Sequence, residues 1–229
     1  MSALAHWLED EGIATTVIAL VRLHAEKIAP PRTLWVPFEL GRPLGPPNDP
    51  AFQRRVLEAA LGLLDSAREA GAIVDFPDDD PDAQPDPDWT CPVQVDAGDL
   101  LAEVAQVRPH YERALARYGR TSVGLSGLDI EQAAAFLAAY ARDEKAERPR
   151  GGLAPASLMR FCADDIKAFY LEAAGSGAGA PSSRQMSDWF WNTTLAARTI
   201  QAIRAGSPHS PDKQRQALGE KSIVPGIYQ

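Results

Sequence analysis

The chain has 229 residues, 45% of them hydrophobic, and it carries a net charge of −8 with a pI near 5.0. This balance excludes broad binding to nucleic acid, because the sequence has no basic stripe that could replace the counterions of a phosphate backbone. The longest apolar run is far shorter than the roughly 18 residues that a membrane span needs, so we expect no membrane partner. The acidic N-terminal stretch MSALAHWLEDEG lacks the pattern of a signal peptide, and we expect a cytoplasmic protein.

The first part of the chain predicts an α/β region at residues 1–76. In chain order we expect a helix at 3–11, a strand at 14–21, one or two helical turns at 22–28, a strand at 32–38, a helix at 50–70 and a strand at 72–76. Gly12 closes the first helix, and Pro37 ends the second strand. The alternation of helix and strand indicates a small parallel sheet.

The expected helix at 50–70 has a clear start and an apolar face. Asp49 can cap it, and Pro50 suits the first helical position, where a missing N–H has no cost. One apolar stripe is predicted from Phe52, Val56, Leu57, Ala60, Leu63 and Leu64.

The loop GRPLGPPNDP, residues 41–50, joins the second strand to this helix. Its prolines fix the path of the loop and restrict the unfolded chain. The loop leads into a helix N-terminus, which favours anions, and it follows a strand at the edge where open α/β sheets bind ligands. We predict a substrate-binding site in which Arg42 grips a carboxylate or phosphate and Asn48 takes part. The alternative is a structural loop with Arg42 on the surface.

A second candidate site is the charged stretch RLHAEK, which follows the first strand at the same edge of the sheet. His24 and Glu26 could perform acid–base chemistry there, and Arg22 could bind substrate. The alternative is a solvated charged turn.

Residues 77–96 form an acidic, proline-rich connector whose carboxylates repel one another. The two cysteines, Cys91 and Cys162, are too far apart for a CxxC motif or a four-ligand zinc site, and isolated thiols favour a reducing compartment. Cys91 is the candidate catalytic thiol. The acidic residues near it would raise its pKa, which favours the alternative of a structural cysteine. Cys162 lies on an apolar helical face and is expected in the core.

The remainder, residues 97–229, predicts a mostly helical region that packs on the first part to form one continuous globular unit. Helices are expected at 97–118, kinked or divided at Pro109, and at 129–143, 155–174 and 182–205, with a short strand or extended loop at 121–127. Asp129 with Gln132, and Ser182 with Gln185, have the spacing of capping boxes.

Carboxylates on the expected helix at 155–174 form a third candidate site. Asp165 falls on or beside the apolar stripe and Glu172 lies on nearly the same side, so Asp165 needs a hydrogen-bonding partner. The expected partners come from Trp189, Trp191, Asn192 and Thr193. With these partners, Asp165 would belong to a polar cluster that fixes the register of neighbouring helices or lines a dimer contact. The alternative is a metal site built from Asp164, Asp165 and Glu172 with His110, although the chain has no ExxH motif and we assign no metal.

Three features of the N-terminal part occur together. EGIAT precedes the first strand, PPRTLWVP at 30–37 precedes the loop, and GPPNDPAFQ at 45–53 leads into a helix that bears Gln53. Together they resemble the C-terminal part of the selenoprotein B-type subunits of the glycine, sarcosine, betaine and D-proline reductases, over about residues 6–64.

The resemblance implies an α/β fold and the reductive cleavage of an amine or amino-acid substrate by a selenocysteine or cysteine. In that family the redox-active motif lies just upstream of the helix that feeds the first strand, and this chain has no cysteine there. The scaffold and the ligand loop therefore carry over, whereas the thiol would have to come from a partner protein or from Cys91.

We therefore expect a reductase-like enzyme or enzyme subunit that binds a small amino-acid-like or anionic substrate at the loop 41–50. One alternative is a non-catalytic binding or assembly module that kept the fold and lost the thiol chemistry, and another is metal-dependent chemistry in the helical half. The expected partners are a small-molecule ligand, a thiol-bearing subunit and a second copy bound through the C-terminal helices. No cofactor is assigned.

Overall fold

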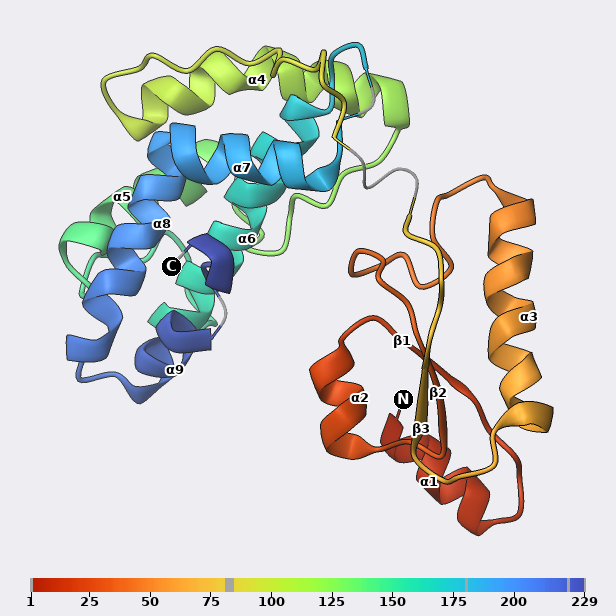
Figure 1. Cartoon of the computed structure of the whole chain (residues 1–229). Helices are drawn as coiled ribbons and strands as arrows, with labels where there is room; N and C mark the ends of the chain where they lie inside the picture. The colour runs from red at the N-terminus through yellow and green to blue at the C-terminus, as the bar shows by residue number, and fades with distance from the viewer. Residues whose placement is uncertain (1, 81–84, 180, 222, 229) are drawn as a thin grey trace. The chain divides into compact units, whose positions relative to one another are not determined.

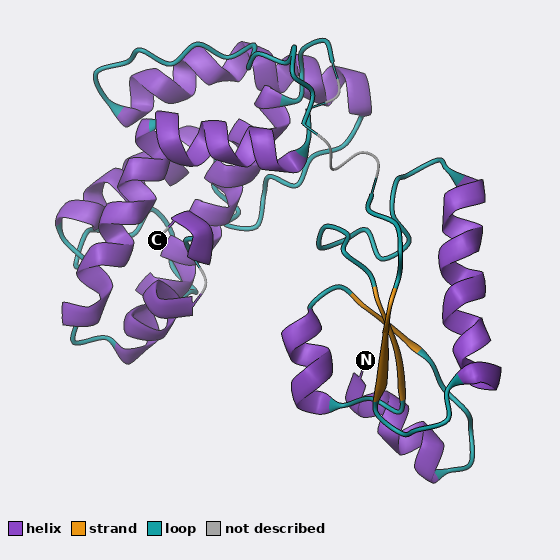
Figure 2. Cartoon of the chain, viewed as in Figure 1, coloured by secondary structure: helices purple, strands orange, loops and turns teal. Residues whose placement is uncertain are grey.

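A computed structural model of the chain describes residues 2–80, 85–179, 181–221 and 223–228. The chain divides into two compact units, Met1–Pro85 and Asp86–Gln229. The strands lie in the first unit, and the second unit is built from helices (Figure 1 and Figure 2). This confirms the expected fold class, a small parallel sheet followed by a mostly helical part. That the helical region packs on the first stays a prediction.

The boundary between the units falls inside the expected connector at 77–96, of which residues 81–84 lie outside the described residues. The later part of this connector belongs to the helical unit. The side chain of Gln185 accepts from the N–H of Asp86 at 2.9 Å and donates to its carbonyl at 2.7 Å, and Val93 is 2% exposed within the helical core.

The N-terminal unit consists of α1 (Ser2–Asp10), β1 (Val17–Ala19), α2 (Arg22–Ile28), β2 (Arg32–Trp35), α3 (Pro50–Ser66) and β3 (Ala72–Asp75). The strands are parallel in the order β1-β2-β3, with Val17 opposite Thr33 and Arg32 opposite Ala72. Each crossover runs through a helix, as parallel pairing requires. All the elements predicted for this region are present, but β1 is shorter than the strand expected at 14–21 because only Val17–Ala19 pairs with β2.

The two faces of this sheet are covered unequally, with α3 on one side and α2 on the other (Figure 1). On the α3 side, Leu34 of β2 belongs to a buried core in which the rings of Phe38, Phe52 and Phe76 lie 5.5 to 5.9 Å apart. On the other side, α2 buries Ala25 alone among its own residues. The main core of the unit therefore lies between β2 and α3.

The apolar residues of α3 form two stripes instead of the single one expected. Phe52, Val56, Ala60 and Leu63 are buried against the sheet. Leu57, Leu61 and Leu64 are 43%, 56% and 38% exposed. Leu57 and Leu64 of the expected stripe are therefore left exposed, because a three-stranded sheet offers only a narrow surface and cannot cover a wider face of the helix.

The C-terminal unit consists of α4 (Leu100–Tyr118), α5 (Ile130–Arg142), α6 (Pro155–Ala174), α7 (Ser183–Thr193), α8 (Leu195–Gly206) and α9 (Lys213–Lys221), with 3-10 turns at Ser207–His209 and Gly226–Tyr228. The central helix is α6, where Leu158, Ile166 and Phe169 are fully buried. Cys162 is buried there as expected. Both predicted capping boxes are present, at the starts of α5 and α7.

One expected helix break is absent and another break was missed. Pro109 does not divide its helix, because α4 continues through it, and a kink at Pro109 stays a prediction. Pro109 and Ala105 are both exposed, so the carbonyl of Ala105 that loses its amide donor can bond to water. The helix expected at 182–205 is divided at Thr194, whose backbone is extended and whose hydroxyl caps α8 by accepting from the N–H of Ala197 at 3.0 Å. The helices α7 and α8 therefore run in different directions (Figure 1).

A buried carboxylate joins three helices of this unit. Glu103 on α4 is 2% exposed, and its carboxylate accepts from the hydroxyl of Tyr170 on α6 at 2.8 Å. It also accepts from the N–H groups of Leu195 and Ala196 at 2.8 and 3.0 Å. These two N–H groups belong to the first turn of α8, where backbone N–H groups have no acceptor within the helix. Glu103 supplies that acceptor, and its negative charge also complements the positive end of the helix dipole.

Candidate functional site

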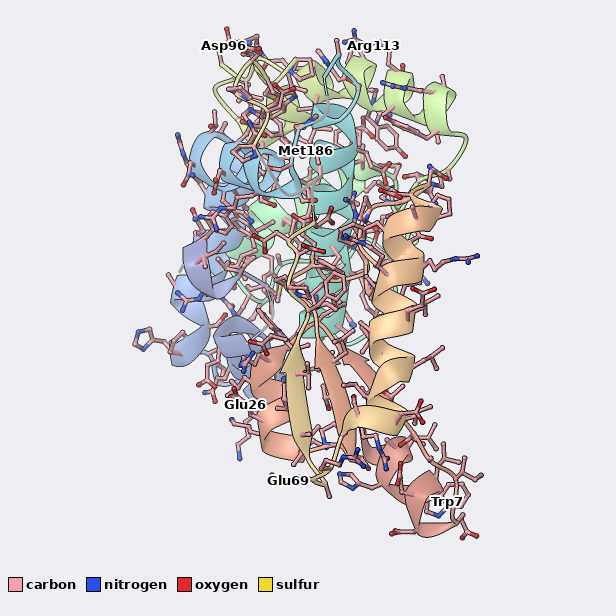
Figure 3. The ribbon with its side chains drawn as sticks, turned by 45° about the vertical axis from the view of Figure 1, so that its right-hand side comes forward. Trp7, Glu26, Glu69, Asp96, Arg113 and Met186 are labelled. Carbon is pink, nitrogen blue, oxygen red and sulfur yellow. The ribbon has the colours of Figure 1, made fainter. Side chains whose placement is uncertain are left out.

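Two of the predicted site residues meet at the carboxyl edge of the sheet. The guanidinium of Arg22 donates to Asp75 at 2.5 Å and to Glu26 at 3.0 Å, and it lies 5.1 Å above the ring of Trp35. The hydrogen bond with Asp75 raises the pKa of Arg22. Asp75 and Trp35 were missed by sequence reasoning, although each is the last residue of a strand and parallel strands end at a common edge. Figure 3 marks Glu26 on α2 beside the sheet.

The acid–base pair expected from His24 and Glu26 is not brought together. Both side chains are exposed on α2, and residues two apart on a helix point to different sides. His24 makes no side-chain hydrogen bond to any residue that the structure describes. Glu26 is engaged by Arg22, so the arrangement resembles a solvated charged turn more than a catalytic pair.

The loop between β2 and α3 is internally braced. The N–H of Arg42 donates to the carbonyl of Glu39, and that of Gly45 to the carbonyl of Arg42, each at 3.0 Å. Gly45 has φ +83°, and a Cβ there would lie 2.5 Å from the ring of Phe52. The side chain of Gln53 donates to the carbonyl of Pro46 at 2.8 Å. Glycine at 45 is thus required both by the turn and by the close approach of Phe52.

The groups expected to bind an anion at this loop already face carboxylates of the protein. Asp49 caps α3, because its Oδ1 accepts from the N–H of Phe52 at 2.9 Å. Arg42 lies 4.0 Å from Asp80, whose side chain is 1% exposed. Asn48 is exposed and has φ +62° in the left-handed region, which Asn tolerates better than most residues. Together with the Arg22–Asp75 pair, these contacts leave little uncompensated positive charge for an anionic ligand.

An open pocket of about 550 Å³ lies at the edge of the sheet beside β1. One wall comes from Leu4, Ala5 and Leu8 of α1, a second from residues 15–18, and a third from Pro43 and Leu44 of the loop. Its lining is mainly apolar, and its volume suits a small organic ligand. The loop 41–50 therefore does border a pocket, but through Pro43 and Leu44 and not through Arg42 or Asn48. We call this the β1-edge pocket.

One residue that lines the β1-edge pocket, Thr16, carries a polar atom without a described partner. The hydroxyl of Thr16 is buried and meets no hydrogen-bond partner among the described residues. The carbonyl of Ala19 accepts from the N–H of Val36 at 3.0 Å, so the backbone groups of Ala19 point toward β2. Because backbone groups of successive strand residues point in opposite directions, the N–H and carbonyl of Ile18 point away from β2. Beside the pocket, the strand edge therefore leaves the backbone groups of Ile18 without a partner among the described strands, and the buried Thr16 hydroxyl lies in the same segment.

The helix α1, which forms one wall of the pocket, is held by an ion pair. Glu9 of α1 accepts from the N–H and the hydroxyl of Thr15, at 2.5 and 3.0 Å, and from Arg32 of β2 at 2.6 Å. The backbone hydrogen bond from Thr15 lowers the pKa of Glu9 most, and Arg32 adds to the effect. This network fixes α1 against the start of β1 and β2, while the exposed ring of Trp7 projects from the same helix (Figure 3).

Cys91 lies in the helical unit, in the wall of a different pocket of about 340 Å³ that Trp89 and Trp189 also line. Burial raises the pKa of the Cys91 thiol to about 11 and that of Cys162 to about 12. A neutral thiol is a poor nucleophile. Burial outweighs the backbone hydrogen bond from Val93 that favours the thiolate, in line with the alternative of a structural cysteine.

The carboxylates of the third candidate site are held by the protein itself. Asp165, 1% exposed, accepts from the N–H groups of Gly124, Leu125 and Ser126 at 2.8 to 2.9 Å and from the Ser126 hydroxyl at 2.6 Å. The partners expected for Asp165 at 189–193 were therefore wrong, because the segment at 121–127 supplies them as a loop. Glu172 holds the same segment through Thr121 and Ser122, at 2.8 and 2.7 Å.

A metal site in the helical half lacks a ligand set. Asp164 pairs with Arg160 at 2.6 Å and with Lys167 at 2.7 Å, and the nitrogen Nδ1 of His110 lies 2.8 Å from Arg113. Within the described ranges, no three His, Cys, Asp or Glu side chains gather as metal ligands. The arrangement is that of a polar cluster that holds a loop against α6.

Comparison of the chain with models of protein families, with curated proteins and with solved structures finds no match. The reductase resemblance accordingly stays a prediction. Of the helices that the structure describes, none combines the length and the apolar character needed to cross a membrane.

Proposed function

We propose that the N-terminal unit is a binding module that takes a small amphipathic molecule into the β1-edge pocket. The ligand has an apolar body and one hydrogen-bonding group, such as a carbonyl or an amide. The observation that carries this proposal is the mainly apolar pocket of about 550 Å³, which is lined by Thr16, a residue whose buried hydroxyl lacks a partner in the described chain. A buried polar group without a partner is costly, and a ligand that bonds to it recovers that cost.

The braced loop supports the same proposal. Pro43 and Leu44 form one wall of the pocket, and the turns around Arg42 and Gly45 keep them in place before any ligand binds. A preformed wall lowers the entropy lost on binding. This keeps the role that the sequence predicts for the loop, but it changes the ligand from an anion to a molecule that is mostly apolar.

Thiol chemistry is not part of the proposal, because burial holds the pKa of Cys91 at about 11. A reductase function would need a thiol-bearing partner subunit, and that function stays a prediction from the resemblance.

The proposal is tested by screening neutral fragments, each with one apolar ring and one carbonyl or amide, against the full chain with ligand-observed NMR. We expect Leu8→Trp to abolish binding, because the indole fills the pocket. The matched control is Leu23→Trp on α2, where the wild-type leucine is 55% exposed and outside the pocket. Equal binding by wild type and Leu8→Trp would contradict the proposal, and so would the absence of any bound fragment.

Thr16→Val separates a ligand-binding role from a structural one. The change keeps the shape of the side chain and removes the hydroxyl. We expect the affinity for carbonyl fragments to fall about tenfold, since one hydrogen bond is lost. Stability without ligand should stay the same or rise, because an unsatisfied polar group disappears. A loss of stability with unchanged affinity would assign Thr16 to the fold instead.

A further inference from the structure

A pocket of about 560 Å³ lies where three helix ends of the helical unit meet. It is bordered by the start of α4, the end of α5 and the start of α8, and both α4 and α5 pack against α8. We call it the α4–α5–α8 pocket. Its apolar lining comes from Leu100, Leu101, Ala138, Ala141, Leu195 and Ala202. Leu101 is 46% exposed, so apolar surface in this pocket is open to solvent, and the volume suits a small organic ligand.

Two arginines also line the α4–α5–α8 pocket. Arg142 is the last residue of α5 and Arg198 lies near the start of α8, and both side chains are exposed. Neither guanidinium forms an ion pair with a described residue, and the Nε of Arg142 donates to the carbonyl of Ala138 at 3.2 Å. The sequence from 189 to 211, which includes all of α8, contains no Asp or Glu. Both guanidinium groups are therefore open to a charged ligand.

The acidic residues around the pocket are already used by the protein. Asp99 lines the pocket, and its Oδ1 caps α4 by accepting from a backbone N–H at 2.9 Å. Glu103 is 2% exposed, does not line the pocket and accepts from the first N–H groups of α8. Asp96, Asp143 and Glu144 do not line the pocket either, and each bonds to another group of the protein. The lining thus carries two positive charges and one negative charge that serves as a helix cap.

We propose that the α4–α5–α8 pocket binds an organic anion that joins an apolar body to a carboxylate or phosphate head group. The apolar lining takes the body, and Arg142 and Arg198 bind the head group. A planar guanidinium suits both kinds of head group, because its N–H groups can donate two parallel hydrogen bonds to their oxygens.

Charge complementarity selects an anion for this pocket. An organic cation would meet two guanidinium groups, and a neutral amphiphile would gain nothing from them. The excess of positive charge in the lining contrasts with the net charge of −8 of the whole chain. The site lies in the helical unit, so it is separate from the β1-edge pocket and takes a different class of ligand.

The first test compares three ligands that share one alkyl chain. The full chain is titrated with hexanoate, hexyl phosphate and hexanol, and binding is followed by heteronuclear NMR. We expect both anions to bind saturably and hexanol to bind at least about fivefold more weakly, because it cannot pair with the arginines. The anion with the higher affinity identifies the head group, and either order supports the proposal. Equal affinities for hexanol and the anions overturn it, and so does the absence of saturable binding by both anions.

The second test removes the positive charges one at a time. Arg142→Gln and Arg198→Gln should each weaken binding of the preferred anion about three- to fivefold and leave hexanol binding unchanged. The matched control is Arg120→Gln, which removes an exposed arginine just beyond the opposite end of α4, outside the pocket. Circular dichroism checks that the variants keep their fold. Equal weakening by all three variants would indicate attraction to the protein as a whole and would overturn the site.

The third test places the apolar body of the ligand. Ala202→Trp should abolish anion binding, because Ala202 is exposed and its indole replacement fills the pocket. Ala116→Trp is the control, at an exposed alanine of α4 outside the pocket, and should bind like wild type. Leu8→Trp, which fills the β1-edge pocket, should also bind the anion like wild type. Loss of anion binding in Leu8→Trp, with retention in Ala202→Trp, would place the anion in the β1-edge pocket and overturn this inference.

Discussion

At the residue scale, the single carboxylate of Asp165 fixes the backbone of a whole loop segment. Three successive backbone N–H groups and one hydroxyl point at it, so the segment at 124–126 has a fixed path without any regular secondary structure. The burial of this carboxylate is tolerated because it accepts four hydrogen bonds, which replace the hydrogen bonds with water that it loses on burial.

Substitution of Asp165 by alanine should therefore be severe. It leaves three amides and a hydroxyl without their acceptor, and we expect a loss of about 3 to 5 kcal/mol in the free energy of unfolding, measured with urea. The neighbour Asp164 is the control, because its ion pairs are partly exposed and Asp164→Ala should cost less than about 1 kcal/mol. Similar losses in both variants would contradict the role assigned to Asp165.

The reactivity of Cys91 is a second prediction at this scale. Burial favours the neutral thiol and raises its pKa to about 11 from the ordinary 9.0. At neutral pH the thiolate fraction is then about 100-fold lower than that of an unperturbed cysteine. We expect alkylation of Cys91 by iodoacetamide to accelerate about tenfold per pH unit between pH 8 and 10, since the thiolate is the nucleophile. The Cys91→Ala chain serves as the control for alkylation at other residues. An alkylation rate of Cys91 that levels off near pH 8 would contradict a raised thiol pKa.

At the scale of elements, side-chain caps decide where helices begin and end. Asp49, Asp129 and Ser182 start α3, α5 and α7 by accepting backbone N–H groups, and each had a readable sequence signal. Thr194 acts in the same way between α7 and α8. It was missed because WNTTLAA has no glycine, no proline and no distal glutamate or glutamine to mark a new start.

Removing this cap tests its contribution. Thr194→Ala deletes the hydroxyl, which accepts from the N–H of Ala197 and donates to the carbonyl of Phe190 at 2.9 Å. We expect the free energy of unfolding to fall by about 1 to 2 kcal/mol, as for other N-cap deletions. Thr193→Ala is the matched control, because Thr193 is exposed and caps no helix, and it should change stability only slightly. Equal effects would mean that the break has another cause.

Local signals explain how much of the architecture the sequence could predict. The parallel sheet followed from β-branched runs alternating with helices, and those signals lie within a few residues of what they specify. The acceptors of the 124–126 segment could not be predicted, since Asp165 lies 39 to 41 residues away from its donors. The same holds for the site: Arg22 was identified, but Asp75, 53 residues later, and the orphaned Thr16 hydroxyl depend on tertiary structure.

At the scale of the whole molecule, the chain builds two separate cores. The core of the first unit draws on residues between 18 and 76, and that of the second on residues from 91 to 228. Each core is therefore assembled from one continuous stretch of sequence, as is usual for domains.

We expect residues 86–229, expressed alone, to fold. The fragment keeps every residue of the larger core cluster, so it should show a helical circular dichroism spectrum and a cooperative urea transition. A broad, non-cooperative transition in the fragment, with a sharp one in the full chain, would show that the helical unit depends on the N-terminal residues for its order.

Glu103 also has a consequence for the order of events in folding. Its carboxylate contacts Tyr170, 67 residues away in sequence, and Leu195, 92 residues away, so its hydrogen bonds form only after three distant helices have met. Contacts between residues so far apart in sequence form late in folding, after the transition state. Their loss therefore changes the unfolding rate more than the folding rate. Glu103→Gln should therefore accelerate unfolding in stopped-flow experiments and leave the refolding rate nearly unchanged. One side chain would in this way set how long the assembled helical unit persists, separately from how fast it forms.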